Sequence, residues 1–191
     1  MALSTIDPQA ALVVIDLQNA IVERLRAAGE AALADELIAR SAELASAFRE
    51  RGLPVVLVNV AGAPAGRTDA GRRMPADVPA DFFALAEGLN TDPTDILVTK
   101  HSVGAFATTD LDAILRERGV TQIVLTGVAT SVGVESTARN AHDLGYHVVL
   151  AADAMADLTP SAHEYAVASV FPRLGEVSST EEILGKLAER A

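Results

Sequence analysis

The sequence contains no cysteine among its 191 residues, and this absence excludes several kinds of chemistry at once. Without thiols the chain cannot form a disulfide, bind a metal through thiolates or attack a substrate with a cysteine nucleophile. Tryptophan is also absent, and aromatic residues make up only 4% of the chain, although half of the residues are hydrophobic. The core must therefore be built from alanine, valine, leucine and isoleucine.

Positive charge is scarce as well. The chain has 15 lysines and arginines but 26 aspartates and glutamates, which gives a formal net charge of −11. The longest basic run is Arg72-Arg73, so neither nucleic acid nor an anionic membrane is expected as a partner. The apolar run near the N-terminus is too short for a membrane span and follows no basic region, so we expect a cytoplasmic protein.

Metal-binding and dinucleotide-binding motifs are missing too. The four histidines lie singly, and no two of them have the spacing of metal ligands on one helix, so no metal is expected. No G-x-G-x-x-G sequence follows the first apolar run, which removes the usual dinucleotide fingerprint. We therefore expect a protein that takes a small-molecule substrate and needs no cofactor.

What the sequence does contain is an alternation of β-branched runs and helical patterns. The runs lack a regular polar face, which is typical of strands buried on both sides of a parallel sheet. They cover residues 10–16, 54–60, 95–100, 121–128 and 146–154, with a weaker sixth at 175–179. Helices are expected at residues 30–52, 109–119 (capped by Thr109), 130–145, 161–171 and 180–190.

This pattern predicts an α/β fold with a doubly wound, mainly parallel sheet of five or six strands and helices on both faces, which is a Rossmann-like architecture. No linker divides the chain, so residues 1–191 are expected to form a single domain. Residues 61–82 are the one long irregular segment and are rich in glycine, proline, alanine and arginine. A loop of this length is usually a functional lid or a mobile segment.

Two charged residues directly follow predicted strands. Asp16 ends the first apolar run and Lys100 ends the third. In a parallel sheet the carboxyl ends of the strands share one edge, where ligands bind, so the two side chains can meet in one crevice. The alternatives are a helix N-cap for Asp16 and an ordinary loop cation for Lys100. The pair favours a functional site more than either residue does alone.

The turn after the fourth run is the third candidate. It passes from a strand into a helix, and the residue at the place expected for a nucleophile is Gly133. The amides after Ala129 open this helix and can hold an anion or a developing oxyanion. Thr130 and Ser131 are interpreted as helix caps rather than catalysts.

A serine hydrolase triad is a further alternative. Residues 129–133 differ by one residue from the G-x-S-x-G nucleophile elbow, and Ser131 is followed by Asp153 or Asp157 and then by His163. The order of the three residue types is correct. Their crowding into a short part of the chain argues against this arrangement.

Taken together, these motifs resemble the isochorismatase-like hydrolase superfamily, which includes cysteine amidohydrolases and isochorismatases. The resemblance rests on VVIDLQN at 13–19, VTKHSVGAF at 98–106, the stretch 126–146 and LAADAMAD at 150–157. It covers nearly the whole chain in the correct order. It implies an isochorismatase-like fold and the activity of a hydrolase.

The resemblance also implies roles for individual residues. In the cysteine hydrolases an Asp, a Lys and a Cys form the catalytic triad, and these positions correspond to Asp16, Lys100 and Gly133. The family carries a cis peptide that corresponds to the bond between Val128 and Ala129. The residues expected to bind substrate are Gln18, Val103, Val128, Ala129, Ser131 and Val132. Homo-oligomers are common in the family, so one is expected here.

Glycine in place of the cysteine narrows the chemistry. The isochorismatases of the family also have glycine at this position, because they hydrolyse a vinyl ether without a protein nucleophile. Their pocket aromatics are replaced here by Ala129 and Val103. We expect a hydrolase that acts on an enol ether or C–N bond of a small polar metabolite through Asp16, Lys100 and water, with Asp16 as acid or base. The alternative is a binding or structural protein of the same fold without turnover.

Overall fold

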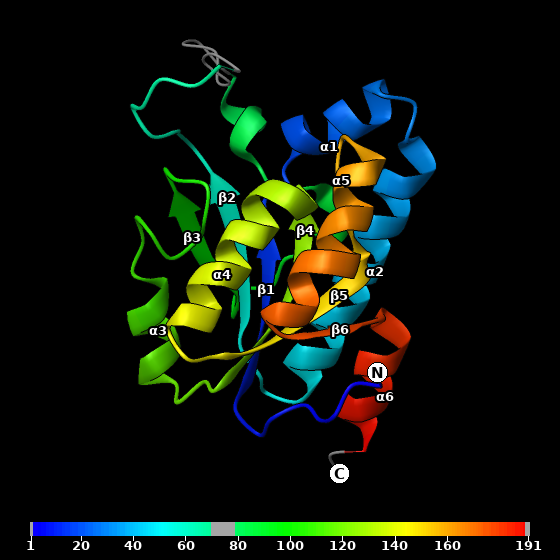
Figure 1. The fold of residues 1–191 in the computed structure, drawn as a ribbon. Helices are drawn as coiled ribbons and strands as arrows, with labels where there is room; N and C mark the ends of the chain where they lie inside the picture. The colour runs from blue at the N-terminus through cyan, green and yellow to red at the C-terminus, as the bar shows by residue number, and fades with distance from the viewer. Residues whose placement is uncertain (1, 70–78, 190–191) are drawn as a thin grey trace.

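The computed structural model describes residues 2–69 and 79–189 and contains a six-stranded sheet (Figure 1). The strands run in the order β3-β2-β1-β4-β5-β6, and every neighbouring pair is parallel. Because the order reverses between β1 and β4, the sheet is doubly wound, as predicted. The strands are β1 (Ala10–Ile15), β2 (Val55–Val60), β3 (Ile96–Lys100), β4 (Gln122–Val128), β5 (His147–Ala156) and β6 (Glu176–Ser178).

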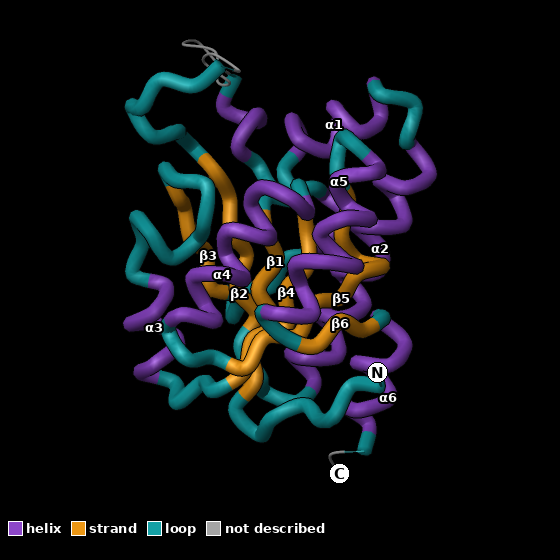
Figure 2. Tube along the Cα trace, in the orientation of Figure 1, coloured by secondary structure: helices purple, strands orange, loops and turns teal. Residues whose placement is uncertain are grey.

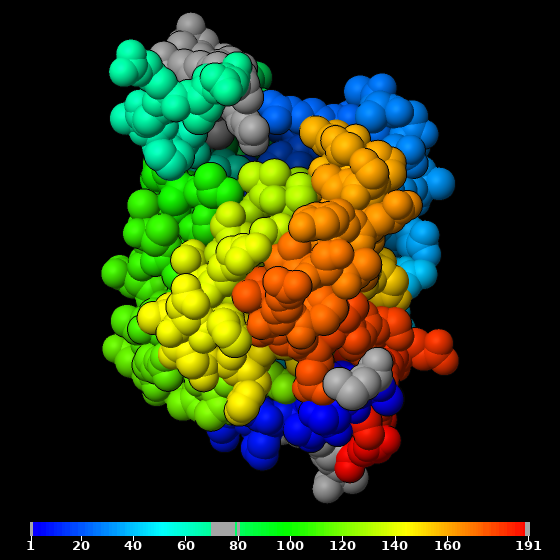
Figure 3. Space-filling model, in the orientation of Figure 1, coloured from blue at the N-terminus to red at the C-terminus, as the bar shows by residue number. Residues whose placement is uncertain are grey.

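Helices cover both faces of this sheet (Figure 1). Helices α1, α2 and α6 pack on one face, while α3, α4 and the helical segment that contains α5 pack on the other. In Figure 3 the yellow residues of α4 and the orange residues around α5 lie against each other across the second face. The helices are α1 (Asn19–Ala27), α2 (Ala31–Glu50), α3 (Leu111–Glu117), α4 (Glu135–Asp143), α5 (Pro160–Tyr165) and α6 (Thr180–Ala188).

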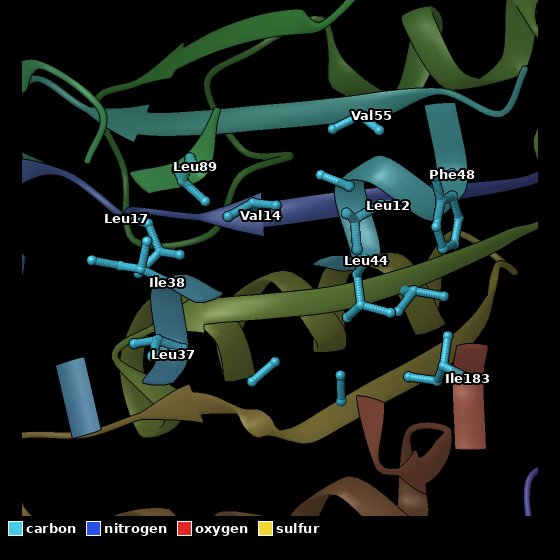
Figure 4. Packing of buried hydrophobic residues seen from close by; sticks show 14 of the residues in the cluster. Leu12, Val14, Leu17, Leu37, Ile38, Leu44, Phe48, Val55, Leu89 and Ile183 are labelled. Atoms are coloured by element: carbon cyan, nitrogen blue, oxygen red, sulfur yellow. The ribbon is translucent and has the colours of Figure 1, made fainter. Parts of the chain in front are cut away.

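The central strand β1 contributes to the core on both faces. Leu12 and Val14 belong to the cluster on the α2 face, and in Figure 4 Leu12 lies beside Leu44 while Val14 lies nearer to Leu17 and Leu89. Val13 and Ile15 belong to the cluster on the opposite face. Because successive strand residues alternate between faces, an uninterrupted apolar run is required wherever both faces are covered. This explains why β1 reads as a continuous apolar sequence.

Gly127 lies where β4 pairs with β1, at the point where the strand order reverses. This residue has a φ of +119° and pairs with Ile15 of β1. A β-carbon on Gly127 would lie 2.0 Å from the carbonyl oxygen of Ile15, so a side chain cannot be accommodated. The carboxyl ends of β1 and β4 therefore lie very close together, and this is the place where ligands bind in sheets of this topology.

The helices differ from the predicted ones in four places. Helix α1 was considered only in the alternative that made Asp16 a helix N-cap and was given no bounds, although Val22 and Leu25 have helical spacing and are buried. Helix α3 begins after Asp110 rather than Thr109, although the Thr109 hydroxyl still accepts a hydrogen bond from the Leu111 amide. The helix expected at 130–145 begins as a π-helical turn, Thr130–Val134, before α4. The single helix predicted at 161–171 includes π-helical and 3-10 turns after α5.

The loops at the carboxyl ends of the strands gather at one end of the molecule, and the two chain ends lie at the other (Figure 2). Of the irregular segment 61–82, residues 70–78 lie outside the described residues, and Ala80–Phe83 form a 3-10 turn. Within the described ranges, no helix is long and apolar enough to cross a membrane.

Candidate functional site

Asp16 lies directly after β1, at the switch point of the sheet. Its amide donates a hydrogen bond to the Val58 carbonyl of β2, and its φ is +53°, which is uncommon for a residue other than glycine. Strained backbone of this kind persists where surrounding structure holds it, and it is concentrated at functional sites. Helix α1 is preceded by Gln18 as its N-cap residue, so the alternative in which Asp16 caps that helix is wrong.

Lys100, at the end of β3, meets Asp16 inside the protein. Its Nζ lies 2.8 Å from Asp16 Oδ2 and donates a second hydrogen bond, of 2.5 Å, to the Val103 carbonyl. Asp16 is only 5% exposed and Lys100 only 1%, so Lys100 is not an ordinary loop cation. Burial of such a pair is costly unless both charges are held by further contacts, and removal of one partner leaves an uncompensated charge.

The two oxygens of the Asp16 carboxyl have different surroundings. Oδ2 is held by Lys100, whereas Oδ1 is buried and has no hydrogen-bond partner among the described residues. Burial raises the pKa of Asp16 to about 6, because desolvation of the carboxylate outweighs the attraction and hydrogen bond of Lys100. A carboxyl with this pKa can give or take a proton near neutral pH.

Gly133 faces this pair from the turn after β4. A β-carbon on Gly133 would lie 3.2 Å from Asp16 Oδ2 and 3.3 Å from Lys100 Nζ. The structure thus brings together the three residues that were expected to form the centre of the site. The Cβ position is also 3.2 Å from the Ile15 side chain, so a larger residue would require a shift of a few tenths of an ångström.

The turn that carries Gly133 is held by a carboxylate of the chain itself. Asp157 Oδ2 accepts hydrogen bonds from the Ser131 amide (2.9 Å) and hydroxyl (2.7 Å), while its Oδ1 accepts one from the Thr159 amide (3.1 Å). The peptide between Val128 and Ala129 is cis. One of the helix-opening amides that were expected to hold an anion is therefore already occupied.

The serine hydrolase alternative is not supported by the contacts in this region. His163 Nδ1 lies 2.9 Å from the Thr130 hydroxyl rather than on Ser131, and Ser131 bonds directly to Asp157. Asp153 points away, to Arg40 and to the start of α6. No histidine connects the serine to an aspartate in these contacts. The expectation that Thr130 and Ser131 cap the helix is also wrong, because no side-chain cap is formed there.

Two of the residues expected to bind substrate are buried and have structural contacts. Gln18 is 1% exposed, its Oε1 accepts from the Val60 amide, and its Nε2 donates to the carbonyls of Val60 and Phe83. It therefore links the end of β2 to the last residue of the 3-10 turn Ala80–Phe83. Val128 packs into the core on the α2 face and is 2% exposed.

The other expected contact residues lie on the turn and on the loop after β3. Ala129, Ser131 and Val132 are partly buried, and Val103 is 42% exposed. The loop that carries Val103 is docked on α4 through Thr137, a residue that the sequence pattern did not single out. Its hydroxyl accepts from the Ala105 amide (3.0 Å) and donates to the Gly133 carbonyl (2.7 Å).

A separate cavity lies beside β2 and β3. It measures about 760 Å³ and is formed on the α2 face of β2 and β3, where Leu57, Leu97 and Phe83 contribute to its walls. Lys100 points to the opposite face, so this cavity is separate from the Asp16 site. Within residues 2–69 and 79–189 no three acidic, histidine or cysteine side chains are grouped as metal ligands would be.

Comparison with known proteins agrees with this architecture. The Isochorismatase domain model matches residues 10–182. The isochorismatase family protein YecD of Escherichia coli O157:H7 is 42% identical over 184 residues, which span 93% of this chain and 95% of YecD. The ureidoacrylate amidohydrolase RutB of Methylobacterium radiotolerans is 32% identical over 203 residues, which span 91% of this chain and 79% of RutB.

A solved structure gives the same result. An isochorismatase family protein from Burkholderia thailandensis superimposes with a TM-score of 0.86 at 41% identity, over 96% of this chain and 98% of that one. The family match, the sequence relatives and the shared fold cover nearly the same residues. The chain therefore belongs to the isochorismatase family of hydrolases.

Proposed function

We propose that the chain is a hydrolase whose attacking group is water, with Asp16 and Lys100 as the acid–base pair and glycine at the position of the family's cysteine. The observation that carries the proposal is the position a β-carbon would take on Gly133, within 3.3 Å of both Asp16 Oδ2 and Lys100 Nζ. A water oxygen near this point would be in reach of a carboxylate and an ammonium together.

Asp16 has two possible roles, and they act on different bonds. As an ionised base it takes a proton from water, whose oxygen attacks the carbonyl carbon, and it returns this proton to the nitrogen as the C–N bond breaks. As an acid it gives a proton to the carbon of an enol ether; water then adds to the oxocarbenium ion, and the product separates into a carbonyl compound and an alcohol. With a pKa of about 6, Asp16 supplies both forms near neutral pH, while the Lys100 ammonium stabilises negative charge that develops beside it.

We propose small polar metabolites as substrates, with a C–N or enol ether bond. The relationship to an amidohydrolase supports the first bond type. Val103, Ala129, Ser131 and Val132 are proposed as contact residues because they lie on the loop and the turn that adjoin Asp16 and Gly133. Gln18 is proposed to position the loop after β2 instead of touching substrate.

The test is a panel of amides, imides, ureido compounds and enol ethers with the purified protein. We expect hydrolysis that is lost in Asp16→Asn and kept in Glu164→Gln, which removes an exposed carboxylate on α5. A base role gives activity that rises with pH through about 6, and an acid role gives activity that falls. No turnover across the panel would favour the non-catalytic binding protein.

A second test needs no substrate. Gly133→Cys places a thiol beside Lys100 and Asp16, where an ammonium favours the thiolate. We expect this thiol to be alkylated by iodoacetamide at pH 7 faster than a free thiol, and Lys100→Met to slow the reaction. An unreactive thiol in a folded variant would show that the site is not organised for catalysis.

We also propose that the chain forms a homo-oligomer through the sheet edge at β3. Leu97 is 69% exposed on this edge strand, beside the 760 Å³ cavity. Exposed apolar surface on an edge strand favours packing or pairing with a second copy. Light scattering should show an assembly for the wild type and a smaller species for Leu97→Glu. A monomeric wild type at micromolar concentration would overturn this proposal.

A further inference from the structure

The Lys100 ammonium is held by a main-chain group as well as by Asp16. Its Nζ donates a hydrogen bond to the Val103 carbonyl, although the Val103 side chain itself is 42% exposed. Lys100 is only 1% exposed, so a donor of this ammonium that lost its acceptor would remain buried without a partner, which is costly. The orientation of the Val103 carbonyl therefore helps to decide where the ammonium lies relative to the Asp16 carboxyl.

A chain of hydrogen bonds through two hydroxyls runs across the loop that carries this carbonyl. Ser102 Oγ donates to the Gly104 carbonyl (2.8 Å) and lies 2.8 Å from Thr108 Oγ1. Thr108 Oγ1 also accepts a hydrogen bond from the His101 amide (3.2 Å). Because the Ser102 hydroxyl has a single hydrogen and gives it to Gly104, the Thr108 hydroxyl is the donor to Ser102. The three bonds therefore run in one direction, from the His101 amide to the Gly104 carbonyl.

This chain encloses Val103. The Ser102 side chain bonds to the backbone two residues further on, so the ring that it closes contains both peptide groups of Val103. Ser102 is only 7% exposed, and its hydroxyl both donates and accepts. Fully bonded hydroxyls in buried surroundings hold their neighbours in one arrangement. The ring thus restricts rotation of the peptide whose carbonyl binds Lys100.

The same loop lies directly on helix α4. A β-carbon on Gly104 would collide with Asn140 Oδ1 and would lie 3.2 Å from the Ser136 carbonyl. The backbone at Gly104 is therefore in close contact with α4 and cannot move further toward it. Since α4 blocks movement in this direction, the hydroxyl chain is the contact within the loop that sets the orientation of the Val103 peptide.

We propose that Ser102 and Thr108 are positioning residues for Lys100, whose ammonium they hold beside Asp16 Oδ2 by fixing the Val103 carbonyl. The inference deepens the proposed function and rests on it, because Lys100 is one half of the proposed acid–base pair. The two hydroxyls bond to groups of the loop itself. They act through the Val103 backbone and not on the reacting atoms.

The experiment is a carboxyl-carbon NMR titration of Asp16 in the wild type, Ser102→Ala and Thr108→Val. Lys100 lowers the Asp16 pKa through its charge and its hydrogen bond, and both effects weaken when the ammonium is free to move. We expect the Asp16 pKa to rise by about 1 in each variant, toward its value in Lys100→Met. A role in packing alone would lower stability without moving this pKa.

Two further variants serve as controls. Ser178 on β6, at the opposite edge of the sheet from β3, is also 7% exposed, and its hydroxyl donates to Glu182 (2.6 Å). Ser178→Ala removes a matched serine hydroxyl and should leave the Asp16 pKa unchanged. Thr108→Ser keeps the hydroxyl in the chain and should titrate like the wild type.

Turnover gives a second measurement. With a substrate that the wild type hydrolyses, Ser102→Ala should lower kcat about tenfold and change KM little, because the ammonium acts on charge that develops during the reaction. If Ser102→Ala fails to fold, Thr108→Val gives the same comparisons, since Thr108 is exposed and its loss is better tolerated.

The outcomes are distinct. An Asp16 pKa that stays unchanged in folded Thr108→Val and Ser102→Ala would overturn the inference and leave the acid–base pair in place. An equal rise in Ser178→Ala, or the same rise in Thr108→Ser as in Thr108→Val, would overturn it as well. Failure of the proposed function looks different, because the wild type would then show no turnover while the hydroxyl variants still raised the Asp16 pKa.

Discussion

At the scale of single residues, the pKa of Asp16 is set by its burial and by Lys100 together. Lys100 lowers the pKa of the Asp16 carboxyl through its charge and its hydrogen bond, while burial raises the pKa more strongly, to about 6. We predict that Lys100→Met moves the Asp16 pKa upward, because both lowering effects are lost. Carboxyl-carbon NMR titration measures this directly, with Glu164→Gln as the control. A wild-type titration near pH 4 would contradict the prediction.

The same shift predicts how stability depends on pH. Because folded Asp16 keeps its proton to a higher pH than the unfolded chain does, the fold opposes ionisation between about pH 4 and pH 6. The contribution of Asp16 to the free energy of unfolding should therefore fall as pH rises across this range, by about 3 kcal/mol in total. Urea unfolding of the wild type and Asp16→Asn at each pH measures the difference. A constant difference from pH 4 to pH 7 would contradict the prediction.

The sequence could predict some of these residues and not others. Asp16 and Lys100 each follow an apolar run directly, and a charge at that place is expensive unless it faces the crevice. The sequence alone could not show whether Asp153 or Asp157 contacts Ser131. The register of β5 against β4 shifts between Leu125 and Gly127, and a strand irregularity of this kind cannot be read from an apolar run.

At the scale of elements, the loop after β3 and helix α4 are joined through Thr137. Its hydroxyl is the partner of the Ala105 amide and of the Gly133 carbonyl, and both Thr137 and Ala105 are fully buried. We predict that Thr137→Val costs about 1–3 kcal/mol, because a buried amide loses its partner. It should also loosen the Val103 carbonyl that holds Lys100.

Chemical denaturation and the alkylation rate of Gly133→Cys, with and without Thr137→Val, measure these two effects. Thr121→Val is the control, since the Thr121 hydroxyl makes an exposed bond to Asp7 and its loss should cost little. Unchanged stability in Thr137→Val would show that the loop does not depend on this contact. Sequence pattern missed Thr137 because a hydroxyl within a helix gives no periodic signal.

Element prediction succeeded where burial on both faces enforces a continuous apolar run, as in β1 and β4. It gave no bounds for α1, because this helix has only nine residues and its buried face rests on two of them, Val22 and Leu25. The π-helical turn Thr130–Val134 was also beyond a periodicity argument, because its contacts with Asp157 and His163 come from a distant part of the chain. Tertiary contacts therefore help to shape the turn that carries Gly133.

At the scale of the whole molecule, we propose that residues 1–191 act as one domain that unfolds as a unit. The two hydrophobic clusters on opposite faces share β1, since Leu12 and Val14 belong to one and Val13 and Ile15 to the other. Neither cluster can be lost without exposing the strand that supports the other.

We predict that hydrogen exchange in α2 and α4, which lie on opposite faces, converges to one free energy of opening as denaturant approaches the unfolding midpoint. Exchange measured by mass spectrometry on peptides from the two helices checks this. The short 3-10 turn Ala80–Phe83, in which Asp81 is exposed, is the internal control and should exchange earlier. Two separate free energies that persist to the midpoint would show that the halves unfold independently.

The close approach at Gly127 has a consequence for how this protein can change. With its Cβ position 2.0 Å from the Ile15 carbonyl, Gly127 cannot accept a side chain where β4 pairs with β1. New substrate preferences must therefore arise in the walls, at residues such as Val103 and Ala129, which are partly accessible. A library that varies those two positions and leaves Gly127 alone would explore new substrates while the sheet beneath the pocket stays intact.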